Sequence, residues 1–215
     1  MRRLSAARMD SLLDQPAFAI SAALEAGDLT ATALMAATLD RIAARNPALN
    51  AIVSLRDADD LMTTAQLADA TPRKGWLHGM PVAIKDLANV AGLPTTMGSP
   101  AFANKPAAHS DVMVQRMQDA GAIVIGKTNT PEFGLGSHTF NPVFGMTRNA
   151  LMPGRSAGGS SGGAAVALAA GMIAVADGSD MMGSLRNPAG WNGVWGMRPT
   201  WGRVPSEPLG DMMLH

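Results

Sequence analysis

The sequence contains no cysteine, carries no net charge and has no long uninterrupted apolar run. The missing cysteine excludes disulfides, a cysteine nucleophile and thiolate metal ligands, and it suits a reducing compartment. Seventeen basic and 17 acidic residues cancel, so the charge balance favours neither nucleic acid nor an anionic membrane as a partner. We therefore expect a cytoplasmic protein that binds neither.

No segment approaches the roughly 18 apolar residues typical of a membrane-spanning helix. Residues 1–8 are basic but lack the apolar run of a secretory signal, and we interpret them as a helix end rather than an organellar leader. A hydrophobic content of 47% over 215 residues indicates a globular chain with one substantial core. We expect a single domain over residues 1–215, with a helical part over about 1–70 and a core over about 71–206.

Helical and extended patterns alternate along the chain. Apolar spacing or helix-forming composition predicts helices over residues 29–45, 57–70, 111–120 and 164–170. We expect Asn46-Pro47 to end the first of these helices. Short apolar runs without alternation predict strands over residues 50–55, 80–84, 122–126 and 172–176. This pattern is typical of an α/β fold whose largely buried β-sheet is covered by helices on both faces.

Two glycine-framed turns hold the serines of greatest chemical interest. Residues 154–163 surround Ser160 and Ser161 with glycines, and residues 178–184 end in Ser184. A nucleophile and its oxyanion site require an exposed hydroxyl beside free backbone N–H groups. A Walker phosphate loop would need lysine in place of Ser160, and an esterase elbow would need a preceding strand and a downstream histidine. Residues 158–162 match the Gly-x-Ser-x-Gly spacing of the elbow, but no strand precedes them and His215 is the only later histidine, so the esterase interpretation is weak. The Walker interpretation is weak because Ser160 stands where the lysine belongs.

A serine nucleophile needs a base, and the four histidines show no spacing that indicates a base or a metal site. Lys85 follows the apolar run 82–84, so we expect its ammonium at the end of a buried strand. Burial penalises the charged form and can lower a lysine pKa from about 10.4 to roughly 7–8. A neutral lysine can accept a serine proton. Taken alone, Lys85 is better explained as a structural lysine paired with Asp86, but the serines favour a base.

Five segments together resemble the amidase signature family. Residues 79–86 resemble its lysine motif, and residues 92–99 resemble the segment after that motif. Residues 158–163 match its Gly-Gly-Ser-Ser-Gly-Gly core. Residues 183–186 resemble its nucleophile turn, and residues 196–204 resemble the strand region beyond. The resemblance runs from about residue 20 to about residue 206. It implies the amidase signature fold, with a mixed sheet, and hydrolysis of a small-molecule carboxylic amide through an acyl-enzyme. It implies neither a metal nor a cofactor.

The resemblance also implies a Ser-Ser-Lys triad. Ser184 would be the nucleophile, Ser160 the bridging serine in a cis peptide after Gly159, and Lys85 the terminal base. Lys85 would take a proton from Ser160 while Ser160 takes one from Ser184. The return path would protonate the leaving amine, and water would then hydrolyse the acyl-enzyme.

The backbone N–H groups that lead to the nucleophile would form the oxyanion hole. They belong to Met181, Met182, Gly183 and Ser184. The family usually has glycine where this chain has Met182; if that position required a positive φ, methionine would cost roughly 1–2 kcal/mol. Around this turn we expect Ser161, Asp180 and Arg186 to support the site, with Arg186 paired to Asp180.

Members of the family are much longer than this chain. The resemblance therefore implies an amidase-like domain that is truncated, with its fold incomplete. Such a chain would expose a sheet edge and apolar surface, so we expect a homo-oligomer or association with a missing C-terminal half. Two alternatives remain open: a catalytically impaired amidase-like module, and the amidase subunit of a tRNA-dependent amidotransferase. The sequence does not identify the amide.

Overall fold

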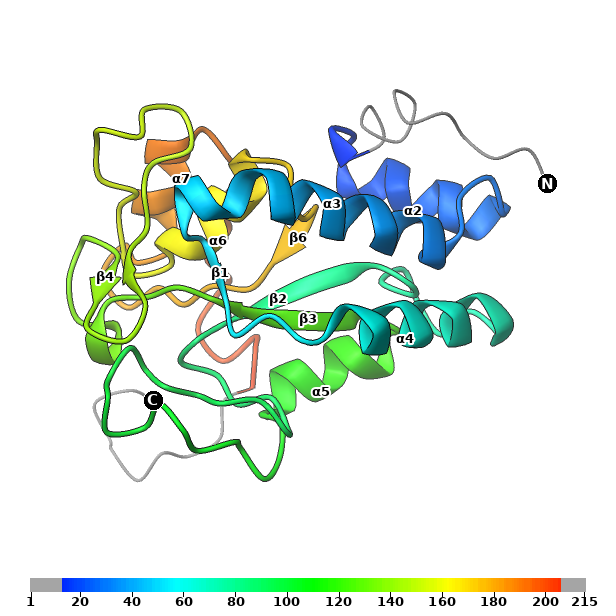
Figure 1. The fold of residues 1–215 in the computed structure, drawn as a ribbon, viewed down its shortest axis with the longest axis horizontal. Coiled ribbons are helices and arrows are strands. Elements are labelled where there is room, and N and C mark those ends of the chain that lie inside the picture. Colours follow the sequence, from blue (N-terminus) through cyan, green and yellow to red (C-terminus); the bar gives the residue numbers. More distant parts are fainter. Residues whose placement is uncertain (1–12, 206–215) are drawn as a thin grey trace.

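The computed structural model describes residues 13–205 and contains one four-stranded sheet packed with helices (Figure 1). The helices are α2 (Ala17–Ala26), α3 (Ala31–Leu49), α4 (Ala58–Ala70), α5 (Val112–Asp119), α6 (Gly162–Ala169) and α7 (Arg186–Asn192), with the 3-10 helix η1 (Glu132–Gly134). The strands are β1 (Ile52–Val53), β2 (Pro81–Lys85), β3 (Ile123–Thr128), β4 (Phe140–Asn141), β5 (Gly145–Met146) and β6 (Val175–Ala176). The basic segment 1–8 and His215 lie outside the described residues. No helix within residues 13–205 has the length and hydropathy that a membrane crossing requires.

The sheet is mixed, as predicted. Its strand order is β1-β3-β2-β6. Strand β1 is antiparallel to β3, whereas β2 is parallel to both β3 and β6. Strands β4 and β5 form a separate antiparallel hairpin. Because β2 and β6 are parallel, their C-terminal ends lie at the same edge of the sheet. Lys85 ends β2 there, and the loop after Ala176 begins there.

Both faces of the sheet are buried, which confirms the predicted layering. Successive strand residues face opposite sides: Ala83 and Ile125 join one core, and Ile84 and Val124 join the other. Helices α4 and α6 pack on the first face, α2 and α5 pack on the second, and α3 contributes to both. Figure 1 shows α3 and α5 on opposite sides of β2 and β3.

The first predicted helix was placed correctly at its start, but its predicted end was wrong. Thr30 caps α3 by accepting the backbone N–H of Ala33, and the helix then runs past Pro47 to Leu49. A proline inside a helix removes one hydrogen bond and crowds the carbonyl four residues earlier, but it does not prevent the residues after it from staying helical. Asn50 closes the helix in the left-handed region, with its N–H donated to the Asn46 carbonyl at 2.7 Å.

The predicted strand over residues 172–176 was also mostly wrong, because only Val175–Ala176 pair with β2. Met172 and Ile173 are buried in the core. The N–H of Met172 is bonded to the Ala167 carbonyl at 2.9 Å, so this part of the apolar run closes the end of α6. Helices α2 and α7 were not predicted from the sequence. The other predicted helices and strands are present with small shifts of their ends.

Candidate active site

Lys85 is the last residue of strand β2 and is buried inside the molecule. All five residues of β2 are buried, and the Lys85 side chain is only 1% exposed. Neighbouring strands hold Lys85 on both sides: Thr128 of β3 is its register partner, and β6 pairs just before it. The predicted position of this lysine, at the end of a buried strand, is therefore confirmed.

Three serine hydroxyls surround the Lys85 amine. Nζ lies 2.7 Å from Ser160 Oγ, 2.9 Å from Ser161 Oγ and 2.8 Å from Ser179 Oγ. Ser160 and Ser161 immediately precede α6, and Ser179 lies in the loop after β6. A charged amine donates to these oxygens, whereas a neutral amine can accept a hydroxyl proton across the same short contact. The geometry thus joins a buried amine to a serine cluster.

Burial lowers the pKa of Lys85 from 10.5 to about 8, in the direction predicted from the sequence. The negative charges of Asp177 and Asp180 act in the opposite direction and raise the pKa. At pH 7 a lysine with this pKa is neutral in about one molecule in ten. An exposed lysine of ordinary pKa is neutral in fewer than about one in a thousand. The site therefore holds a usable proton acceptor near neutral pH.

Asp86 does not pair with Lys85. Its carboxylate lies 3.5 Å from the ammonium of the buried Lys127 and accepts hydrogen bonds from the N–H and the hydroxyl of Thr96. Lys127 also donates to the Ala88 carbonyl at 2.6 Å. The sequence-based alternative, a structural pair of Lys85 with Asp86, is therefore wrong. The partner of Asp86 comes from β3, a strand much later in the chain.

The glycine-rich segment that leads into the first turn of α6 is packed against backbone. The Gly159-Ser160 peptide is cis, as the resemblance implied. A Cβ on Gly159 would lie 2.8 Å from the backbone nitrogen of His138. A Cβ on Gly163 would lie 2.3 Å from the backbone nitrogen of Asn129. These approaches are closer than any side chain permits, so the glycines are needed to bring Ser160 against the lysine.

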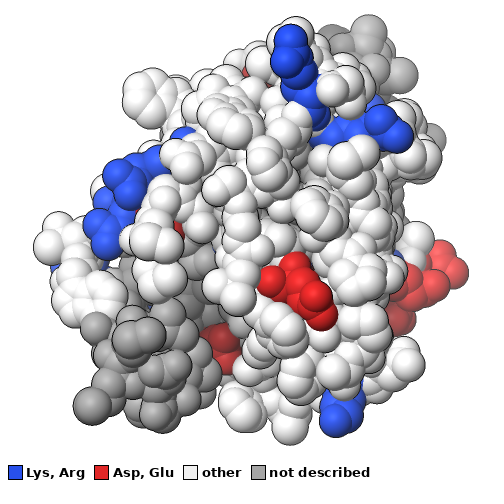
Figure 2. Space-filling view, turned by 90° about the vertical axis from the view of Figure 1, so that its left-hand side faces the viewer, with Lys and Arg blue, Asp and Glu red and all other residues white. Residues whose placement is uncertain are grey.

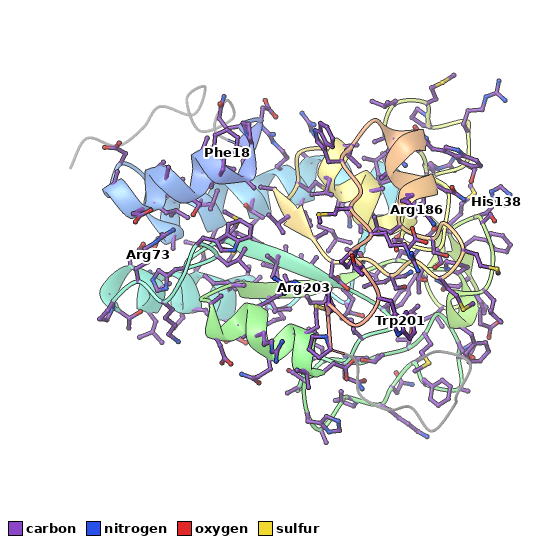
Figure 3. The ribbon with its side chains drawn as sticks, turned by 180° about the vertical axis from the view of Figure 1, so that it is seen from behind. Phe18, Arg73, His138, Arg186, Trp201 and Arg203 are labelled. Carbon is purple, nitrogen blue, oxygen red and sulfur yellow. The ribbon has the colours of Figure 1, made fainter. Side chains whose placement is uncertain are left out.

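Asp180 organises the turn that carries Ser184. Its carboxylate accepts the backbone N–H of Gly183 at 2.7 Å and the guanidinium of Arg186 at 2.8 and 3.1 Å. The hydrogen bond from Arg186 holds the pKa of Asp180 well below its usual value. The expected pair between Asp180 and Arg186 is thus confirmed, and Figure 3 shows Arg186 where α7 begins. On the other side of the turn, the Ser184 carbonyl accepts the Ser161 N–H at 2.9 Å.

Among residues 13–205, three backbone N–H groups of this turn have no acceptor. Because the Gly183 N–H is bonded to Asp180, it does not point to open space. Within residues 13–205, the N–H groups of Met181, Met182 and Ser184 have no hydrogen-bond acceptor. The left-handed position is Gly183, with φ 99°, and Met182 does not adopt a positive φ. The strain considered for Met182 is therefore absent.

The second link of the expected relay is not formed. Among the described contacts, no hydrogen bond joins the hydroxyls of Ser160 and Ser184. The turn is instead bonded to Ser161, whose backbone N–H donates to the Ser184 carbonyl.

Two residues at the site were missed by sequence reasoning. Ser179 could have been noticed in its glycine-framed turn, and Asp177 as an acidic residue directly after an apolar run. Within residues 13–205, no group of three His, Asp or Glu side chains is arranged to hold a metal ion.

A family model described as Amidase matches residues 33–214, which is most of the chain. The chain belongs to the amidase family. This confirms the resemblance that the five motifs indicated. The described residues have the amidase signature fold, since solved structures of that family superpose on them.

Relatives of known name are longer proteins. The chain is 41% identical over 200 residues to a glutamyl-tRNA(Gln) amidotransferase subunit of Acidothermus cellulolyticus, covering 91% of this chain and 39% of that protein. It is 42% identical over 196 residues to an acylamidase of Rhodococcus erythropolis, covering 88% and 40%. A crystal structure of a bacterial aryl acylamidase matches with a TM-score of 0.83 at 32% identity, covering 92% and 42%. The chain thus spans about two fifths of the length of these relatives.

Proposed function

We propose that this chain forms the catalytic core of an amide hydrolase that works through an acyl-enzyme on Ser184. The observation that carries the proposal is the state of Lys85. Its amine is buried, burial lowers its pKa to about 8, and Nζ lies 2.7 Å from Ser160 Oγ. A base with a pKa near the working pH is effective in general base catalysis.

In the proposed reaction, Ser184 attacks the amide carbonyl and gives its proton to Ser160, which passes its own proton to Lys85. The resulting ammonium returns a proton along the same path to the leaving nitrogen, because an amide anion leaves poorly. An ester to Ser184 remains, and water cleaves it by the same proton transfers. The hydrogen bond between Ser160 and Ser184 would form when substrate brings the Ser184 hydroxyl into line.

The oxyanion of the tetrahedral intermediate would bind the free N–H groups of Met181, Met182 and Ser184. Gly183 is the fourth donor that the resemblance implied, and it would take part only if it released Asp180. One oxyanion donor typically contributes about 2.7–4 kcal/mol. Asp180, through its bonds to Gly183 and Arg186, would hold these donors in place as a support rather than contact the substrate.

After α7 the chain exposes large apolar side chains: Trp195 is 100% exposed, and Met197 and Trp201 are 82% and 67% exposed. Figure 2 shows a face formed largely by uncharged residues, and Figure 3 places Trp201 on the loop after α7. We propose that a segment equivalent to the remainder of the longer relatives, or a second copy of the chain, covers this surface. Size-exclusion chromatography with light scattering distinguishes a self-associated chain from a monomer.

A fluorophosphonate probe followed by peptide mapping tests the proposed nucleophile. We expect the label on Ser184, with labelling lost in Ser184→Ala and retained in a Ser5→Ala control. Labelling of Ser160 instead would overturn the assignment of roles. Turnover of simple amides by the purified chain is a separate readout. If turnover survives Ser184→Ala, the acyl-enzyme proposal is wrong; if the label lands on Ser184 without turnover, the chain is an impaired module.

A second candidate function is that of an amidotransferase component. It is favoured by the 41% identity over 200 residues to the amidotransferase protein described above. Such a role would need partner subunits, ATP and glutamine as the amide. Release of ammonia from glutamine, measured with and without the partner subunits, separates the two candidates. Stimulation by the partners would support the amidotransferase role, and hydrolysis of unrelated amides without them would support the free hydrolase.

A further inference from the structure

Asp177 lies beside the end of β2. Strand β6 pairs with β2 through Val82 with Val175 and Ala83 with Ala176, so the next residue of the chain, Asp177, is level with Ile84, directly before Lys85. The Asp177 carboxylate accepts the backbone N–H of Lys85 at 2.6 Å. A side chain thus supplies the acceptor at the point where the paired part of β6 ends. This contact fixes the backbone from which the Lys85 amine projects.

The charged groups around Asp177 come from two strands. Lys85 faces it from β2 and Lys127 faces it from β3. Lys127 is paired with Asp86 at 3.5 Å, and the charges of Asp86, Asp177 and Asp111 all act to raise its pKa. Asp86 is thus engaged by Lys127, and its charge is not among those that act on Lys85. Asp177 is left as the carboxylate with the strongest electrostatic effect on Lys85.

Asp180 is the other carboxylate that acts on Lys85, but it is engaged elsewhere. Its oxygens accept the Gly183 N–H and the Arg186 guanidinium, so the positive charge of Arg186 balances it. Asp177 has no comparable arginine partner among the described ion pairs. Burial raises the pKa of the Asp177 carboxyl, while the Lys85 N–H and the charges of Lys85 and Lys127 act to lower it.

We propose that Asp177 is a positioning residue for Lys85, which orients the lysine through its backbone and stabilises the ammonium that forms when Lys85 accepts the proton of Ser160. The proposal rests on the proposed function, in which Lys85 is the base. In the step concerned, the proton leaves Ser160 Oγ, the lone pair of Nζ forms the new N–H bond, and the carboxylate stays anionic. The later return of the proton restores the neutral amine. Asp177 therefore forms no bond to the substrate and moves no proton itself.

The carboxylate has two opposite effects that an experiment can separate. Its charge favours the protonated lysine, so it reduces the fraction of neutral base at a given pH. The same charge stabilises the ammonium that develops during acylation, so it speeds the reaction once the base is neutral. Removing the charge should move the acid limb of the pH profile to lower pH and also lower the plateau. A purely structural residue would produce neither shift when its hydrogen bond is kept.

Asp177→Asn is the variant that makes this separation. Its amide oxygen retains an acceptor for the Lys85 N–H, and only the charge is lost. Lysine-selective NMR is practical because the 22.2 kDa chain has four lysines, Lys74, Lys85, Lys105 and Lys127. The Lys85 signal is assigned by its loss in Lys85→Arg. We expect Asp177→Asn to lower the pH midpoint of the Lys85 signal by about one unit.

Asp59→Asn is the matched control, since Asp59 lies exposed on α4 and its replacement removes the same charge. The Lys85 midpoint should stay unchanged in this control. Asp177→Glu keeps the charge and should keep the midpoint near that of the wild type. If Asp177→Asn does not fold, Asp177→Ser serves in its place, as it also keeps an acceptor. An unchanged Lys85 midpoint in the folded uncharged variant would overturn the proposal.

The rate of fluorophosphonate labelling at Ser184 provides the second readout. In Asp177→Asn we expect the acid limb of the labelling-rate profile to move to lower pH with the Lys85 midpoint. The plateau of the labelling rate should fall about tenfold. A profile identical to that of the wild type would show that Asp177 acts only through its hydrogen bond, which would also overturn the proposal. Absence of any label on Ser184 in the wild type would refute the proposed function instead. The NMR titration is independent of that failure and still tests the coupling of Asp177 to Lys85.

Discussion

Replacing Lys85 by arginine removes the proposed proton acceptor but keeps a cation able to donate to the same serines. An arginine guanidinium has a pKa above about 12 and stays charged under all practical conditions. Lys85, with a pKa of about 8, is neutral in half of the molecules at pH 8. Since general base catalysis contributes about 10²–10⁴-fold, we expect Lys85→Arg to slow fluorophosphonate labelling of Ser184 by a factor in that range.

The pH profile of the wild type supplies the quantitative part of this prediction. The neutral fraction of Lys85 rises from about 1% at pH 6 to about 50% at pH 8, and it levels off about one unit above. The labelling rate should therefore rise about fiftyfold between pH 6 and pH 8 and reach a plateau near pH 9. In Lys85→Arg, the labelling rate should be low and should not show this rise between pH 6 and pH 8.

The assay is a quenched time course of labelling at constant ionic strength, with the label on the Ser184 peptide measured by mass spectrometry. Lys74→Arg is the control, since Lys74 is exposed and distant in sequence from the serine cluster. Lys85→Met tests whether any loss in the arginine variant comes from its larger size. If Lys85→Arg keeps both the rate and the acid limb while Lys74→Arg behaves as the wild type, another group is the base and the reasoning fails.

Three further predictions concern stability, each measured by urea unfolding. Gly163→Ala should destabilise the folded chain by about 1–3 kcal/mol through overpacking, because its Cβ would lie 2.3 Å from the Asn129 backbone. Gly154→Ala is the control: its Cβ would meet nothing within 4 Å, so this variant should unfold like the wild type. Asp57→Ala should cost about 1 kcal/mol through loss of the α4 cap, and Asp57→Ser should recover most of it. Because the folded pKa of Lys85 lies below the unfolded value, the unfolded chain binds more protons between about pH 8 and 10.5, so stability should rise with pH in that window. Lys85→Met should reduce this rise by about 3 kcal/mol; an equal rise in the variant would show that burial of Lys85 carries no such free energy.

Local patterns were sufficient for much of the fold. The Asp57 cap, the apolar run before Lys85 and the helix-forming run after Ser161 each indicated an element that the structure contains. Errors arose where distant contacts decide the outcome. The end of α3 depends on how Asn50 closes the helix, and Met172 is used by α6 instead of a strand. Neither choice can be read from spacing, because the competing local conformations differ little in free energy.

For the candidate site, the sequence itself supplied Lys85, Ser160 and Ser184 as the groups of interest, through a buried strand end and two glycine-framed turns. It also indicated the direction of the Lys85 pKa, because burial next to an apolar run penalises charge whatever the details of packing. Only the tertiary structure decided which groups touch. It paired Asp86 with Lys127, placed Ser179 on the Lys85 amine and brought Asp177 to the Lys85 backbone. These contacts join β2 to β3 and to the loop after β6, which become neighbours only after the sheet has formed. Their distances therefore depend on strand order and register, which cannot be read from the linear sequence.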